Sequence, residues 1–238
     1  MHSLLPLLQL TDSAFPVGAF SHSYGLETAL QENRVKDSHG LLEWLTAYLV
    51  TGLAPMEGTG VYWSCHYAEW LHTASPDRTN AEEHLKNLDR RLTLSRFARE
   101  SREGAIKVGK RYLALARELY PASGLDLYSD WIRNKECYGH PAVVHGWLSM
   151  HLQLSRKTAV VCYLYNEINS LVQNALRAMT IGQLEAQKVL QSMFPMIEQA
   201  TGRLLADPPA ADALYSCSLL QEIEAMRHET LYSRLFMS

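Results

Sequence analysis

The sequence lacks several features that would assign it to a common class of protein. It has no long basic run, and 22 Lys and Arg against 25 Asp and Glu give a formal net charge of −3, which argues against a nucleic-acid partner. Its longest uncharged apolar run, Ala159 to Tyr165, is too short to cross a bilayer. The opening MHSLLPLLQL lacks the basic start of a secretory signal. We therefore expect a cytoplasmic protein with no membrane segment.

Metal-binding and redox motifs are also missing. The chain has no CxxC pair, which argues against a zinc knuckle and a dithiol site. Among the 10 histidines, His140 and His151 could share a helix face, but they would lie about 16 Å apart at 1.5 Å per residue. We expect no metal site within one chain, although a site shared between subunits stays open. The four cysteines are scattered and are expected to be reduced: Cys65, Cys137, Cys162 and Cys217.

Strand-like alternation is almost absent, whereas helical spacing recurs along the whole chain. Apolar residues from Arg96 to Tyr120 advance by three or four positions and form one stripe of an amphipathic helix. Thr158 to Met179 repeats this pattern with few charges, as is typical of a buried central helix. The sequence predicts one all-α, bundle-like domain of about eight to ten helices over residues 1–238. Residues 1–12 and 234–238 are expected to be flexible until a partner binds.

Local signals predict where helices begin and end. Asp37 or Ser38 is expected to open one helix, and Ser21 or Ser23 to cap the helix through Leu26. Thr180 with Gln183 fits a capping box, and Pro195 should kink or interrupt the helix that follows. Further helices are expected at Met56 to Leu71, from Asn80, at Asp126 to Arg133, from Pro141 and at Ala213 to Phe236.

Three stretches imitate catalytic or nucleotide-binding motifs without meeting their requirements. GAIKVGKR (Gly104 to Arg111) matches G-x-x-x-x-G-K, but Arg111 replaces the required Ser or Thr and the stretch lies inside a predicted helix. Small residues at Ser101, Ala105, Gly109 and Ala116 favour close helix packing instead. Ser21-His22-Ser23 does not fit a nucleophile elbow, and the acidic pairs Glu82-Glu83 and Glu222/Glu224 fit solvated helix faces. We therefore expect no catalytic residues.

The remaining candidates are surfaces for protein binding. Asp12 to Glu27 combines two phenylalanines with three glycines, and Arg227 to Ser238 ends in apolar residues next to arginine. Aromatic residues and arginine are the usual anchors of interfaces. Packing of the tail onto the protein's own core is an equally good alternative. If the face of Arg227 is buried, its guanidinium needs an acceptor.

Five segments together resemble the urease accessory protein UreF family. They are LLQLTDSAFPVGAFSHSYGLE, RFARESREGAIKVGKRYL, HPAVVHGW, NALRAMTIGQLEAQ and RHETLYSRLFMS, in the family's order along nearly the whole chain. The first and last are specific, whereas the others alone are weak. Thr180 and Ala186 depart from a proline and a glycine of the family pattern, so a local helix start and any contact with bare backbone there are in doubt.

The resemblance implies a non-enzymatic, all-α, usually dimeric protein. It implies that the chain bridges the accessory protein UreD (also called UreH) and the GTPase UreG while nickel is delivered into apo-urease. Nickel would be in transit, with no tightly bound cofactor. The carried-over residues for UreD/UreH or the dimer mate are Phe15, Pro16, Gly18, Phe20, Ser21, His22, Gly25, Glu27, Arg227, His228, Glu229, Arg234, Leu235 and Phe236. Those for the GTPase are Arg177, Gly182 and Gln183.

Each carried-over set has a purely structural alternative. Gly18 and Gly25 could serve turns or helix packing, and Glu229 could pair with Arg177 or Arg234. Two other functions also stay open at this point. One is a helical enzyme with a buried pocket lined by Tyr, Trp and His, and the other is a helical adaptor unrelated to urease.

Overall fold

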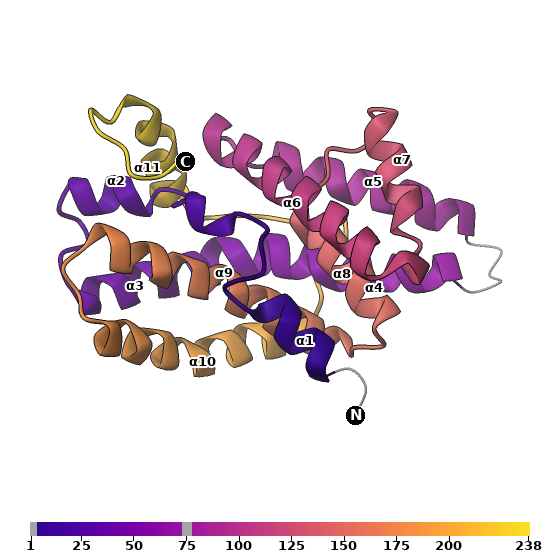
Figure 1. Cartoon of the computed structure of the whole chain (residues 1–238), viewed down its shortest axis with the longest axis horizontal. Coiled ribbons are helices and arrows are strands. Elements are labelled where there is room, and N and C mark those ends of the chain that lie inside the picture. Colours follow the sequence, from indigo (N-terminus) through magenta and orange to yellow (C-terminus); the bar gives the residue numbers. More distant parts are fainter. Residues whose placement is uncertain (1–3, 73–77) are drawn as a thin grey trace.

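The computed structural model describes residues 4–72 and 78–238, with only the main chain of Leu4, Arg78 and Thr79. Within these ranges every regular element is a helix and none is a strand, which confirms the all-α prediction. No helix in the described part has the length and apolar character needed to span a membrane. The α-helices (Figure 1) are α1 (Leu4–Thr11), α2 (Leu26–Gln31), α3 (Ser38–Tyr48), α4 (Thr59–His72), α5 (Arg78–Leu94), α6 (Arg99–Leu119), α7 (Leu125–Arg133), α8 (Pro141–His151), α9 (Arg156–Ala178), α10 (Gln183–Ala206) and α11 (Leu219–Arg227).

A long helical run forms the centre of the domain. Helix α3 continues through a π-helical segment, η2 (Leu49–Gly58), into α4, so the predicted start near Met56 lies inside this run. Helix α4 packs against α5, α8 and α9, whereas α3 packs against α10 (Figure 1). Contact between α4 and α8 is close, because the Ser64 hydroxyl donates to the Val143 carbonyl oxygen over 2.7 Å.

Helix α6 confirms the close-packing interpretation of its glycine-containing stretch. All four small residues of the predicted track are buried on one face of this helix. A Cβ atom on Gly109 would lie 1.9 Å from the Gly139 carbonyl oxygen, in the loop before α8. Only glycine therefore allows this approach, and the stretch is a packing surface within a helix.

Helix starts were predicted with mixed success. The Asp37 side chain accepts a hydrogen bond from the Gly40 N–H over 2.8 Å, as expected of an N-cap. The Thr180 prediction is wrong, because α10 begins later and Gly182 is its N-cap residue. Capping by Ser21 or Ser23 is also wrong, because Gly25 precedes α2 in a left-handed conformation. Pro195 does not interrupt α10.

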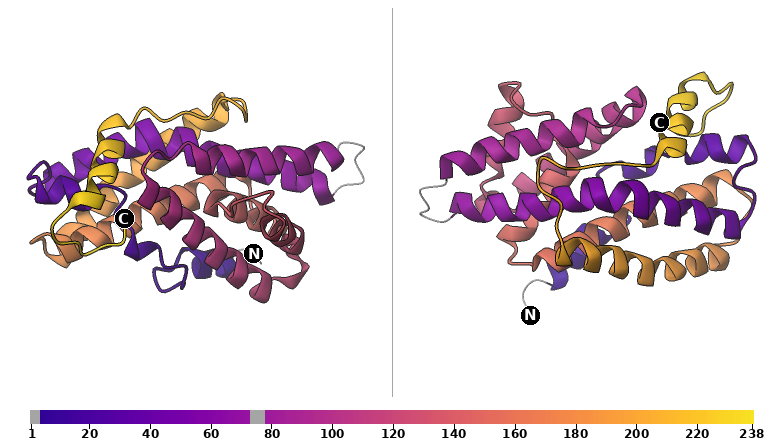
Figure 2. Two further views of the ribbon diagram at one scale, coloured as in Figure 1. Left: turned by 90° about the horizontal axis from the view of Figure 1, so that it is seen from above. Right: turned by 180° about the vertical axis from the view of Figure 1, so that it is seen from behind.

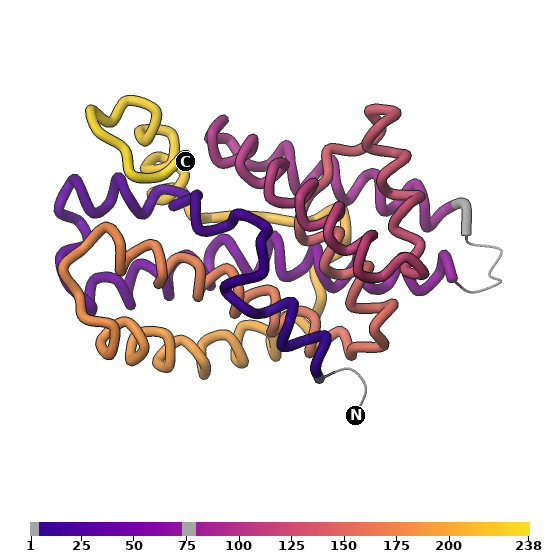
Figure 3. Tube along the Cα trace, in the orientation of Figure 1, coloured from indigo at the N-terminus to yellow at the C-terminus, as the bar shows by residue number. Residues whose placement is uncertain are grey.

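The segment after α10 is less helical than predicted. It crosses the back of the domain (Figure 2), where the Trp63 indole donates to the Pro209 carbonyl oxygen over 2.8 Å. Only α11 and a single 3₁₀ turn, η4 (His228–Thr230), are helical within the predicted range Ala213 to Phe236. The chain then returns beside α2, so both ends of the sequence contribute to one region (Figure 3).

Candidate functional site

The N-terminal motif and the tail, more than 200 residues apart in sequence, form one folded unit. Gly25 adopts a φ of +98°, and a Cβ atom there would lie 2.8 Å from the Gln221 carbonyl oxygen. Glycine thus allows α11 to pack directly against the start of α2. Gly18 is different, because its φ of +84° serves a turn and a Cβ atom there would meet no other part of the chain within 4 Å.

Main-chain hydrogen bonds hold the last residues of the tail. The main-chain oxygen of Ser238 accepts from the Ser23 hydroxyl over 2.8 Å and from the Tyr24 N–H over 3.3 Å. The Met237 N–H donates to the Ser21 carbonyl oxygen over 2.8 Å. These donors and acceptors replace the partners that a helix would provide, which explains why the predicted helix does not reach Phe236.

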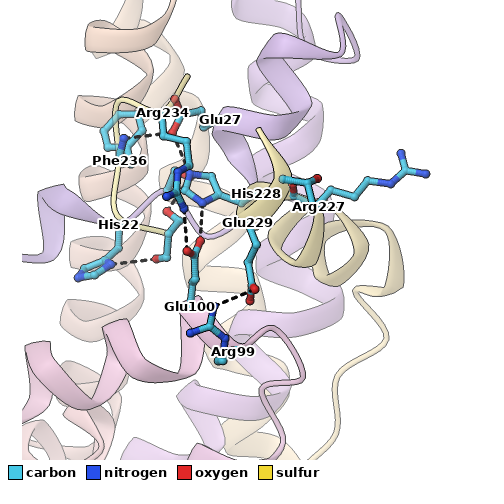
Figure 4. Close-up of polar contacts among 12 residues, drawn as sticks. His22, Glu27, Arg99, Glu100, Arg227, His228, Glu229, Arg234 and Phe236 are labelled. Carbon is cyan, nitrogen blue, oxygen red and sulfur yellow. Dashed lines mark hydrogen bonds and ion pairs between the residues drawn. The ribbon is translucent and has the colours of Figure 1, made fainter. Parts of the chain in front are cut away.

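His228 is the centre of this unit, and we call Glu27, Glu100 and His228 the tail-anchoring cluster. His228 is fully buried, with Nε2 2.9 Å from a Glu27 oxygen and Nδ1 2.7 Å from a Glu100 oxygen (Figure 4). The Glu27 carboxylate also accepts from the N–H groups of Leu235, over 2.6 Å, and Phe236, over 3.1 Å. One side chain of α2 therefore positions both η4 and the end of the tail.

Each ring nitrogen of His228 faces a carboxyl oxygen, so the cluster is held together by two polar contacts on one side chain. Burial of Glu100 acts to raise its pKa, but hydrogen bonds from His228 and Arg234 outweigh it and hold this pKa below its ordinary value. The Arg234 guanidinium lies 2.8 Å from Glu100 and adds a positive charge beside it.

His22 lies beside the tail but carries no charge at neutral pH. Its Nδ1 lies 2.9 Å from the Ser238 hydroxyl, and its carbonyl oxygen accepts from the Asn174 amide over 2.8 Å. Burial, followed by the positive charges of Lys107 and Arg96, lowers the pKa of His22 to about 4. The imidazole is thus a neutral packing and hydrogen-bonding group.

Arg177 belongs to this unit, although the sequence grouped it with the GTPase residues. Its guanidinium donates to the Phe20 carbonyl oxygen over 2.9 Å and lies 4.9 Å from the centroid of the Phe236 ring. Gly182 and Gln183 are exposed at the start of α10. Arg177 therefore connects α9 to both the N-terminal motif and the tail.

Several predicted site residues are exposed around the cluster. Glu229 pairs with Arg99 over 2.9 Å, so its predicted partners, Arg177 and Arg234, are wrong. Arg227 is exposed and points away from the cluster toward Glu32, 3.3 Å away (Figure 4). The large apolar side chains exposed on the two segments are Phe20, Leu235 and Met237, together with the aromatic ring of Tyr232, whereas Phe15 is half-buried and Pro16 is exposed.

Sequence reasoning missed two residues that complete the unit. Glu100 supplies half of the His228 environment from α6, and Ser238 supplies the acceptor for the Ser23 and Tyr24 groups. Glu100 lies in the segment that carries the second family motif, but only the fold places it 2.7 Å from a residue 128 positions later.

A second buried polar group lies near the π-helical segment. Glu57 pairs with Arg96 and accepts from the Tyr163 hydroxyl over 2.5 Å. Burial acts to raise the pKa of Glu57, but Arg96, His140 and the Tyr163 hydroxyl together outweigh it and keep this pKa below its ordinary value. Burial and the nearby Glu57 charge raise the pKa of Glu167 to about 8.

One cavity tests the idea of a buried ligand pocket. It has a volume of about 90 Å³ and is lined partly by Phe15, Tyr112, His145 and Glu167. Ligand pockets usually measure about 300–1,000 Å³, so this cavity is too small for a substrate of ordinary size. The described residues contain no group of three or more His, Cys, Asp or Glu side chains placed to hold a metal ion.

Comparison with known proteins identifies the family of this chain. The UreF family model matches residues 35–194, more than half of the chain. A urease accessory protein UreF of Bacillus sp. (strain TB-90) is 37% identical over 238 residues, covering all of both chains. One of Lachnoclostridium phytofermentans is 37% identical over 236 residues (99% of this chain, 98% of the relative), and one of Streptococcus salivarius is 33% identical over 240 residues (100% and 96%). These relatives span both the N-terminal motif and the tail. The chain therefore belongs to the UreF family, whose members are accessory proteins and not enzymes.

Proposed function

We propose that this protein is a non-catalytic scaffold of urease maturation that bridges UreD/UreH and the GTPase UreG. In this role it acts in the cytoplasm, as a homodimer, while nickel is delivered into apo-urease. Nickel is in transit through the assembly and is not a cofactor of this chain. Membership of the UreF family supports the role in urease maturation.

The geometry of the two chain ends supports the scaffold role most directly. Buried hydrogen bonds and ion pairs fix the main chain of the N-terminal motif and of the tail. Besides the fully exposed Tyr232, the same segments expose three large apolar side chains, Phe20 at 53%, Leu235 at 50% and Met237 at 58%. A rigid main chain that presents apolar side chains loses little entropy on binding. We assign this surface to UreD/UreH.

The start of α10 is the better candidate for the GTPase. Gly182 and Gln183 are exposed there, and the departing residue Thr180 is exposed as well. Ala186, the second departure, is fully buried, so its methyl group packs inside the domain. A dimer would present two copies of this segment, and light scattering on the purified chain tests the dimer.

Co-purification with UreD/UreH tests the assignment of the chain ends. Replacing the three exposed residues together, Phe20→Asp, Leu235→Asp and Met237→Asp, should weaken binding at least about tenfold, because charge is poorly tolerated at an apolar interface core. Helical circular dichroism and thermal stability should stay close to wild type. Leu119→Asp, at the exposed end of α6, is the matched control. Unchanged binding of the triple variant would refute the assignment.

A further inference from the structure

The solvent face of α6 carries a cluster of cations without partners. Lys107, Lys110 and Arg111 are exposed, and none of them makes an ion pair or hydrogen bond with the rest of the described chain. No acidic residue occurs between Gly104 and Arg117. The other arginines of this helix do have partners. Arg99 pairs with Glu229, Arg102 donates to main-chain oxygens, and Arg117 pairs with Asp126.

This cluster is unfavourable for the isolated chain. Residues three and four positions apart are neighbours on a helix surface, so Lys107 lies beside both Lys110 and Arg111. Like charges at this spacing destabilise a helix. Glu103, four positions before Lys107, is the nearest acidic residue on this helix, and it pairs with Arg99 over 3.7 Å. No acidic residue stands beside Lys110 and Arg111 on α6 at this spacing, so an anionic partner would relieve the repulsion between the cations.

The opposite face of α6 holds the cations in a fixed arrangement. Gly109 lies against the loop before α8, and a Cβ atom on Gly104 would lie 2.6 Å from the His22 ring. Helix α6 therefore cannot shift without breaking its close contacts with the loop before α8 and with His22. Cations on such a rigid support are arranged before a partner arrives, which reduces the entropy lost on binding.

The cluster continues into the surface formed by the chain ends. Exposed Phe20 and buried Val108 line the same cavity, so Phe20 lies close to the helix turn that carries Lys107 and Arg111. The positive charge of Lys107 also reaches His22, whose pKa it helps to lower after burial. An aromatic side chain next to cations has the composition of an interface anchor.

The charge of the whole chain decides which class of anion fits. The net charge is −3, so the cluster is a local basic surface on an acidic protein. Domains that bind nucleic acid usually have a pI above about 9, whereas the pI of this chain is about 6.4. An acidic segment of a protein matches three cations on a single helix face better.

We propose that Lys107, Lys110 and Arg111 form a docking face for an acidic surface of UreD/UreH, the partner assigned to the adjoining Phe20 surface. This inference rests on the proposed function and extends it from the exposed apolar side chains to α6. The cations steer an acidic partner toward the Phe20 surface and confer salt dependence on binding.

Binding of UreD/UreH and of UreG is measured at several salt concentrations with wild type and with Lys107→Glu/Lys110→Glu/Arg111→Glu. We expect the variant to lose about tenfold or more in affinity for UreD/UreH at low salt, and its remaining binding to depend less on salt. Loss of UreG binding alone would contradict the proposal. A second variant with the same change in charge, Arg133→Glu/Lys157→Glu/Arg203→Glu, replaces exposed cations on α7, α9 and the end of α10 and should stay within about twofold of wild type.

Zero-length carbodiimide coupling gives an independent readout, because it joins Lys amines to carboxylates in direct contact. We expect cross-links from Lys107 or Lys110 to Asp or Glu of the partner. Equal binding of UreD/UreH by both triple variants would overturn this inference and leave the proposed function standing. The same holds if the Lys107→Glu/Lys110→Glu/Arg111→Glu variant loses binding only to an RNA probe and keeps its binding to the protein partners. Failure of wild type to bind either protein would overturn the proposed function, and this inference with it.

Discussion

Replacing His228 with glutamine tests the tail-anchoring cluster. The imidazole lies between Glu27 and Glu100 and is fully buried, and Glu27 is 4% exposed. A glutamine amide can donate to one carboxylate but must turn its oxygen toward the other. Breaking a buried ion pair in this way usually costs about 3–5 kcal/mol, because it leaves a charge uncompensated.

Two measurements follow this substitution. Urea denaturation at pH 7 should show a loss of about 3–5 kcal/mol in the free energy of unfolding. Limited trypsin digestion followed by mass spectrometry should show faster cleavage after Arg227 and Arg234, because the tail is released first. Glu229→Gln is the matched control, since it removes only an exposed pair with Arg99 and should change stability little. A loss below about 1 kcal/mol with unchanged cleavage would refute the reasoning.

Two further predictions concern stability. Gly109→Ala should lower the free energy of unfolding by about 1–3 kcal/mol through overpacking. Gly202→Ala, where no atom lies within 4 Å of the new Cβ, should raise it by up to about 1 kcal/mol. The reverse order in urea denaturation would contradict the packing of α6. Acidification should lower the stability of the folded protein. In the unfolded chain histidines bind protons with pKa values near 6.5, whereas in the folded protein burial lowers the pKa values of three histidines to about 4. The free energy of unfolding should therefore decrease as pH falls from about 6.5 to about 4, with each histidine contributing up to about 1.4 kcal/mol per pH unit, and higher stability at pH 5 than at pH 7 would refute this. Glu167, with its pKa raised to about 8, acts in the opposite direction but is one group against three. The three histidines whose pKa burial lowers to about 4 are His22, His140 and His145.

Features determined by neighbouring residues were predictable from the sequence. The apolar stripe from Arg96 to Tyr120 predicts α6, and the small residues on it predict close packing, because both follow from the helical repeat. The helix start at Asp37 or Ser38 was predictable because a capping acceptor lies only three residues from the donor it satisfies, and the structure has Asp37 as the cap.

Features determined by distant residues were not predictable from local patterns. The apolar tail has a helical pattern, but its N–H groups donate hydrogen bonds to the Glu27 carboxylate and the Ser21 carbonyl oxygen. The chain therefore does not continue as a helix after Thr230. In the same way, Arg177 donates a hydrogen bond to the carbonyl oxygen of Phe20 and so packs with the N-terminal motif and the tail. Its place in the same sequence motif as Gln183 did not indicate this contact. The resemblance to a family identified both ends as important without showing that they contact each other.

The central claim is that the chain acts through the surface formed by its two ends and has no reactive centre of its own. The most direct measurement is activation of apo-urease by nickel in the presence of UreD/UreH, UreG and GTP, titrated with this protein. The account predicts that urease activity rises with added protein, levels off at a stoichiometric amount, and stays near background with Phe20→Asp/Leu235→Asp/Met237→Asp. Full activation without the protein, or equal activation by that variant, would contradict it.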